Sequence, residues 1–210
     1  YITGLLYVVL ASFFEGFFLT NNVFITHTLI ILSLSQFLSL RQGEMSNSKI
    51  FNGTFLFGVA CCLYPPFLFC IPFIYLMIRV FQPFSLRDFL LFISGLSVPF
   101  IYLLSFFYVQ NRKVEFDFYI TSNQNLIDNN ILIFFIILLF FVAVSLYAML
   151  TKETKITIKL RKLFFILFYW ILIGLGIGVA ELIINNSYYV FSICMIPISF
   201  ILTYSFISKR

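Results

Sequence analysis

The feature that most constrains this chain is how few of its residues are charged. Asp, Glu, Lys and Arg make up 10% of the 210 residues, while 62% are hydrophobic and 31 residues are Phe. A soluble domain needs a polar surface to cover a core of that size, and this composition does not provide one. Successive apolar runs of roughly 18–22 residues are each long enough to cross the hydrocarbon core of a bilayer. The sequence therefore predicts an all-α fold, a polytopic transmembrane helical bundle.

The positions of the apolar runs predict about eight membrane segments. These are expected at 2–20, 23–40, 51–64, 66–81, 88–109, 131–150, 163–184 and 188–207. Most connections are short, and the two longer ones are an outer loop at 110–130 and a basic cytoplasmic loop at 151–162. We expect 1–210 to form a single transmembrane domain of a longer chain, because the sequence begins with Tyr1 rather than Met.

A double proline, Pro65-Pro66, interrupts the apolar stretch 51–81. Proline removes a backbone donor and disfavours helix in the residue before it, so a helix break is expected here. The stretch is either one long kinked crossing or a helical hairpin. The hairpin is favoured because it places 11 of the 13 basic residues on one side of the membrane. The segment 51–64 would be about 21 Å long, and a re-entrant segment is the alternative to a full crossing.

In this topology both ends of the given chain are cytoplasmic, and the chain is multi-pass. The basic loop is expected to contact anionic lipid headgroups, so membrane lipids are predicted partners and nucleic acid is not. The residues predicted to make these headgroup contacts are Lys152, Lys155, Lys159, Arg161 and Lys162.

Glu15 and Glu181 lie inside apolar runs, and His27 lies at a similar depth. A carboxylate at membrane depth is costly and usually has a function. The three side chains would converge on an outward-facing pocket, where a carboxylate accepts a proton or binds a cationic group. The alternative, which we favour, is that each glutamate reaches the headgroups or pairs with a polar neighbour.

Small residues recur in the seventh predicted segment and permit close approach of a second helix. Packing within the same bundle is favoured over a subunit interface. These residues are Gly174, Gly176, Gly178 and Ala180.

Signatures of metal and cofactor chemistry are absent from the sequence. The four cysteines form no CxxC pair, and His27 is the sole histidine, so neither a zinc site nor a histidine-ligated haem is expected. There is no Walker A loop, GxSxG or HExxH motif. We therefore expect no cofactor, no metal and no catalytic residues beyond the three polar candidates.

The stretch 51–100 contains three short blocks of characteristic residues. These are Phe51, Gly53, Gly58, Leu63, Tyr64 and Pro66; Phe84, Ser85, Arg87 and Asp88; and Gly95, Leu96 and Pro99. With these blocks the stretch resembles an uncharacterised Phe-rich multi-span inner-membrane family of Bacteroidota. The resemblance implies a bacterial inner-membrane location and a longer parent chain, and it supplies no catalytic residues. A weaker resemblance, carried by the Gly-rich helix followed by a proline bend, is to polyprenyl-sugar-dependent integral membrane glycosyltransferases.

Three functions are compatible with these features. The first is a non-catalytic subunit or scaffold of an envelope membrane complex, which implies other membrane-protein subunits as partners. The second is a membrane enzyme or carrier for a lipid-linked polyprenyl substrate. The third, suggested by the high Phe content alone, is an organelle-encoded accessory subunit of a respiratory complex.

Overall fold

The computed structural model describes residues 2–12, 21–40, 47–110, 136, 140, 143–144, 147, 158–185 and 189–207. Within these residues the regular structure is entirely helical, which confirms the predicted all-α class. The helices belong to two compact units of the chain. One unit is Thr20–Phe118, and the other combines Tyr1–Leu19 with Tyr119–Arg210.

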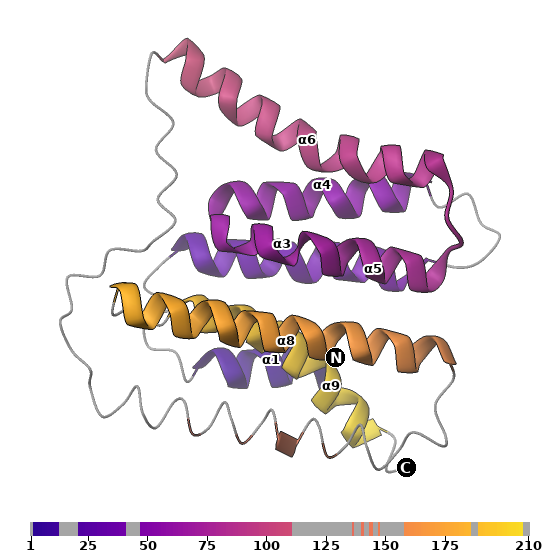
Figure 1. The fold of residues 1–210 in the computed structure, drawn as a ribbon, viewed down its shortest axis with the longest axis vertical. Coiled ribbons are helices and arrows are strands. Elements are labelled where there is room, and N and C mark those ends of the chain that lie inside the picture. Colours follow the sequence, from indigo (N-terminus) through magenta and orange to yellow (C-terminus); the bar gives the residue numbers. More distant parts are fainter. Residues whose placement is uncertain are drawn as a thin grey trace. The chain divides into compact units, whose positions relative to one another are not determined.

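The unit Thr20–Phe118 is built around a central helix. Its elements are α3 (Asn21–Leu38), α4 (Asn47–Leu63), η1 (Pro65–Cys70), α5 (Ile71–Phe81) and α6 (Leu86–Val109). α4 packs against both α3 and α6 (Figure 1). The Ser33 hydroxyl on α3 donates to the carbonyl oxygen of Gly53 on α4 at 2.7 Å, a buried hydrogen bond between the two helices. A Cβ on Gly53 would meet the ring of Phe37 at 2.7 Å, so glycine is needed where α3 crosses.

The double proline breaks the helix as predicted. α4 ends at Leu63, and Tyr64, the residue before the prolines, is extended with φ −141° and ψ 93°. The 3-10 helix η1 follows, and α5 then runs back in the direction opposite to α4 (Figure 1). The stretch 51–81 is therefore a helical hairpin and not one kinked crossing.

The hairpin gathers three cationic side chains, Lys49, Arg79 and Arg87, at one end of this unit, hereafter the basic end. The Lys49 ammonium donates to the carbonyl oxygen of Ser39 at 3.1 Å. The Arg87 guanidinium lies 2.6 Å from the end of the Asn47 side-chain amide, whose oxygen accepts from it when the amide is turned over. The Arg79 guanidinium lies 4.7 Å from the centroid of the Phe84 ring, within cation–π range.

The other unit contains α1 (Ile2–Ser12), α8 (Ile158–Asn185), η3 (Tyr189–Cys194) and α9 (Met195–Ile207). α9 packs against α1 and α8, and η3 packs on α8. Buried residues of this unit include Trp170 on α8 and Phe191 on η3. α8 begins at Ile158, five residues before the predicted start at 163, because the basic segment 158–162 continues the helix.

The glycines of α8 lie on two different faces. A Cβ on Gly174 would meet the Cys194 Sγ at 2.7 Å, and one on Gly178 would meet the Phe191 ring at 2.6 Å. This face packs within the same unit. Gly176, by contrast, has no atom within 4 Å of an added Cβ, and Ala180 is exposed.

The described residues contain two helices that are long and apolar enough to cross a membrane, not the eight segments that we expected. These are Leu86–Val109 (α6) and Leu160–Ala180 within α8. The apolar run at 23–40 forms one helix that ends at Leu38, and the runs at 66–81 and 188–207 form shorter helices because 3-10 segments take up part of each. The apolar window of α6 is only 17% buried, whereas that of α8 is 44% buried.

Candidate functional site: a groove between α4 and α6

The three polar residues proposed from the sequence belong to different parts of the chain, one of which lies outside the described residues. His27 lies on α3, fully buried, and its ring makes a T-shaped contact with the Phe67 ring at a centroid distance of 5.4 Å. Glu181 lies on α8 in the other unit, and Glu15 lies outside the described residues. Their convergence on a pocket stays a prediction.

The predicted headgroup-binding residues are described only in part. Arg161 and Lys162 are exposed in the first turns of α8, and Lys159 belongs to the same helix. Lys152 and Lys155 lie outside the described residues, as does the outer loop 110–130 beyond Gln110. Contact of this basic segment with lipid stays a prediction.

α4 and α6 run parallel (Figure 1) and approach each other through four small or compact residues, two on each helix. A Cβ on Gly95 of α6 would stand 3.0 Å from the Phe51 carbonyl oxygen and would also clash with the Thr54 hydroxyl. That hydroxyl is held on its own helix, donating to the Ile50 carbonyl oxygen at 2.9 Å. One helical turn further along, Gly58 of α4 lies against Pro99 of α6. The two helices are therefore closest between Gly95 and Pro99.

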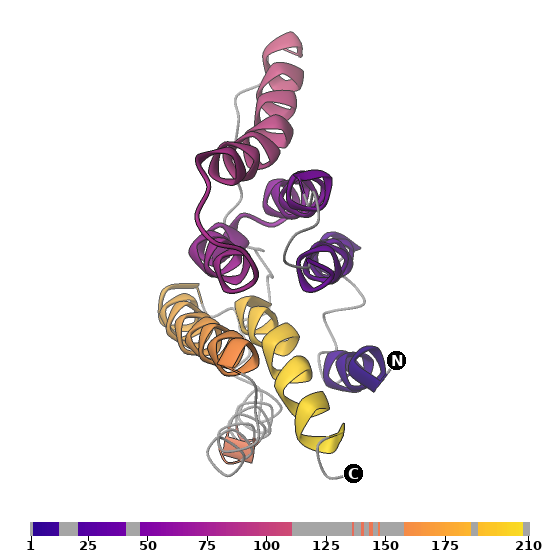
Figure 2. The ribbon, with the colours of Figure 1, turned by 90° about the vertical axis from the view of Figure 1, so that its right-hand side faces the viewer.

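Beyond Pro99 the two helices diverge. A proline inside a helix removes one hydrogen bond to the preceding turn, and its ring pushes against that turn, so the helix bends. The second half of α6 bends away from α4 in the ribbon (Figures 1 and 2). Tyr102 and Tyr108 in this half are 76% and 84% exposed.

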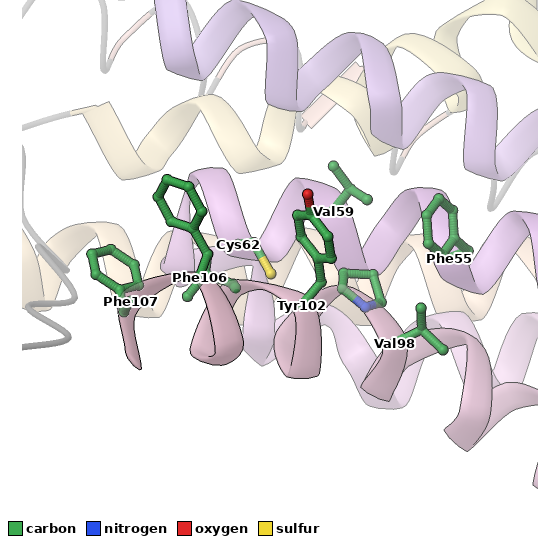
Figure 3. Close-up of a pocket in the computed structure, with 9 residues that line it drawn as sticks. Phe55, Val59, Cys62, Val98, Tyr102, Phe106 and Phe107 are labelled. Atoms are coloured by element: carbon green, nitrogen blue, oxygen red, sulfur yellow. The ribbon is translucent and has the colours of Figure 1, made fainter. Parts of the chain in front are cut away.

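The divergence opens an apolar groove of about 650 Å³, hereafter the α4/α6 groove. Figure 3 shows side chains from both helices facing this space, with Cys62 contributed by α4 and Tyr102 and Phe106 by α6. The lining residues are Phe55, Val59, Cys62, Val98, Pro99, Tyr102, Leu103, Phe106 and Phe107.

The chemistry of the groove is that of a hydrocarbon surface. None of the lining residues is charged, and the side-chain heteroatoms among them are the Cys62 sulfur and the Tyr102 hydroxyl oxygen. Among the described residues no three His, Cys, Asp or Glu side chains gather where they could hold a metal ion. The groove is thus suited to hold an apolar group, and it offers no acid–base pair for catalysis.

Our sequence-based candidates did not include the groove residues. The signal that could have found them was present in Gly58 and Pro99, because a tight helix contact followed by a proline bend must open a wedge. What could not be read from the sequence is that α4 and α6 are neighbours. Several residues of the family resemblance, among them Gly58, Gly95 and Pro99, meet at the contact where the wedge begins.

Comparisons of the chain with protein-family models, with curated proteins and with solved structures find no match. The resemblance to the Bacteroidota inner-membrane family therefore stays a prediction.

Proposed function

We propose that this chain is an integral membrane protein that acts as a non-catalytic subunit or scaffold of an envelope membrane complex, in the bacterial inner membrane. The observation that carries the proposal is the apolar surface of α6. A core helix of a soluble protein is mostly buried, whereas the apolar window of α6 is only 17% buried. An apolar helix surface that the chain itself leaves mostly exposed needs hydrocarbon or a protein partner to cover it.

The exposed face of α8 supports a partner helix in particular. Gly176 and Ala180 are one turn apart, and the open space beside Gly176 leaves room for a second backbone. Exposed Leu172 and Ile173 precede this pair in the sequence, and exposed Val179 lies between its two members. Small residues flanked by apolar ones are the usual contact between membrane helices, because they allow close van der Waals packing.

The experiment has two parts that use the full-length protein. Washing membranes with alkaline carbonate should leave the protein in the membrane fraction, and purification in a gentle detergent should yield stoichiometric membrane-protein partners. Release by carbonate would refute membrane integration. A monodisperse monomer without partners would refute the subunit role while leaving membrane integration intact.

A matched pair of variants locates the contact. Gly176→Leu should remove the partners without lowering the melting temperature of the purified chain, because nothing stands within 4 Å of an added Cβ. Gly178→Leu should destabilise the chain itself, since the added atoms would meet the Phe191 ring. Partners that survive Gly176→Leu would contradict this contact.

The second candidate function is a carrier or enzyme for a lipid-linked polyprenyl substrate. The α4/α6 groove favours it, because its lining suits a hydrocarbon tail. Co-purification of a polyprenyl lipid with a partner-free monomer would support this candidate over the first.

A further inference from the structure

We propose that the α4/α6 groove binds a single hydrocarbon chain of a membrane lipid, and that the lipid belongs to the leaflet opposite the basic end. This inference rests on the proposed function to the extent that α6 must lie in a membrane. It goes further by assigning a ligand class and a depth to one particular surface.

The chemistry of the lining selects an apolar ligand. The lining residues are all uncharged, and seven of the nine carry only carbon atoms in their side chains. A ligand with polar groups along its length would lose its hydrogen bonds to water here and find few replacements, at a cost of about 1–3 kcal/mol per group. A hydrocarbon chain loses nothing of this kind on entering the groove.

The dimensions of the groove fit a slender ligand. Along α6 the lining extends from Val98 to Phe107, which is about 14 Å at the helical rise. A single acyl or isoprenoid chain can lie along this length within the groove of about 650 Å³ without moving α4 or α6.

The position of the groove along α6 selects the leaflet. α6 has 24 residues and is about 36 Å long, enough to cross a hydrocarbon core of about 30 Å. Arg87, in the first turn, belongs to the basic end. Val98 and Phe107 lie about 18 Å and 32 Å from the start of the helix. The groove thus occupies the half of the span remote from the basic end.

Tyr108, near the end of α6 remote from the basic end, supports the same placement of the groove in the membrane. Tyr108 follows the groove, one residue before the last residue of α6, and is 84% exposed. Tyrosine is enriched at the boundary between hydrocarbon and headgroups, where its ring is apolar and its hydroxyl meets water. A lipid whose headgroup lies near Tyr108 can place one chain in the groove.

The test is photo-crosslinking of the full-length protein in liposomes. One probe is a phosphatidylcholine with a diazirine near the end of one acyl chain, and the second is a polyprenyl phosphate with a diazirine on its chain. Adducts are mapped by peptide mass spectrometry. We expect adducts on lining residues such as Leu103 and Phe106, in excess over Ile101 and Leu104, which are exposed on α6 but do not line the groove. The probe that labels more strongly identifies the source of the chain.

A matched pair of tryptophan variants tests occupancy. Val98 is an exposed lining residue and Ile101 an exposed residue outside the lining, so neither substitution strains the fold. Val98→Trp should reduce the groove adducts about tenfold, which corresponds to excluding about two methylene groups from the groove. Ile101→Trp should leave them unchanged.

Two outcomes would overturn the inference. Equal labelling of lining and non-lining residues of α6 would mean ordinary lipid contact, and the membrane proposal would stand without a specific site. Adducts that persist in Val98→Trp would place the bound chain elsewhere. Failure of the proposed function is separately visible, because carbonate would then release the protein from the membrane.

Discussion

Gly58 on α4 lies directly against Pro99 on α6. A Cβ on Gly58 would stand 3.0 Å from the Pro99 Cγ and 3.1 Å from the carbonyl oxygen of Leu96. Pro99 is therefore the last residue of the close contact between α4 and α6. It also bends α6, and the groove opens where the two helices diverge beyond it. Contact and groove share one cause, and a change at either residue should alter both.

The close approach at Gly58 predicts a large cost for a bigger side chain. Gly58→Leu should lower the free energy of unfolding by about 1–3 kcal/mol, because the obstructing atoms are a proline ring and a backbone carbonyl. Gly176→Leu is the control, since that glycine also lies inside a helix but faces open space. The measurement is thermal unfolding of both purified proteins in detergent. Equal melting temperatures would contradict the packing described.

The bend at Pro99 predicts a change in distance between the ends of α4 and α6. Pro99→Ala restores the missing backbone donor, so α6 should straighten and approach α4. Spin labels at Leu63 and Val109, both exposed, should then give a shorter mean distance by pulsed electron resonance. Pro72→Ala in the first turn of α5 should change nothing, because proline costs little there. An unchanged distance in Pro99→Ala would mean that packing alone sets the bend.

The hydrogen bond from Ser33 to Gly53 predicts a specific contribution to the α3–α4 contact. Ser33→Ala should reduce stability by about 0.6–2 kcal/mol, the range measured for hydrogen bonds between membrane helices. Ser35→Ala should have a smaller effect, because its hydroxyl is exposed and bonds only to Leu32 of its own helix. Denaturant titration of the two variants measures both losses of stability. A larger loss in Ser35→Ala than in Ser33→Ala would refute the contribution assigned to the Ser33 hydrogen bond.

The burial of the four cysteines predicts which of their thiols a maleimide can modify. Cys61, Cys70 and Cys194 are buried, whereas Cys62 is partly exposed and lines the groove. N-ethylmaleimide should therefore modify one thiol per chain under native conditions and four after denaturation, as counted by intact mass. Cys62→Ala should abolish the native modification. Rapid reaction of a second native thiol would contradict the burial of the other three.

The hairpin predicts that two connections lie on the same side of the membrane. Cysteines introduced at Ser48 and Pro83, both exposed at the basic end, should react with an impermeant maleimide from one side only. A cysteine at Val109, at the far end of α6, should react from the other side. Labelling of right-side-out and inverted vesicles distinguishes the sides. Opposite sidedness of Ser48 and Pro83 would refute the hairpin in the membrane.

Much of the helical layout could be predicted from local sequence. The break at Pro65-Pro66 follows from backbone sterics, and the gathering of Lys49, Arg79 and Arg87 follows from the hairpin that loop charge favoured. The number of full-length spans was overestimated, because apolar runs do not reveal where turns and 3-10 segments shorten a helix. The stretch 188–207 illustrates this, since η3 takes up its first part and α9 has only 13 residues.

The site was harder to predict because it is made of ordinary apolar residues. Phe55, Val59 and Phe106 carry no chemical signature, and only their meeting across a wedge distinguishes them. Glu15, His27 and Glu181 were chosen because polar side chains are rare at membrane depth in this chain, and their convergence on a pocket stays a prediction.

The sequence by itself determined that this chain is helical, highly apolar and broken at its double proline, because composition and backbone sterics act locally. Only the tertiary structure decided that α4 lies between α3 and α6, that Gly174 and Gly178 face η3 while Gly176 does not, and that a groove opens beyond Pro99. These features depend on which surfaces meet. That choice is made by packing between segments far apart in the chain, which no local pattern encodes.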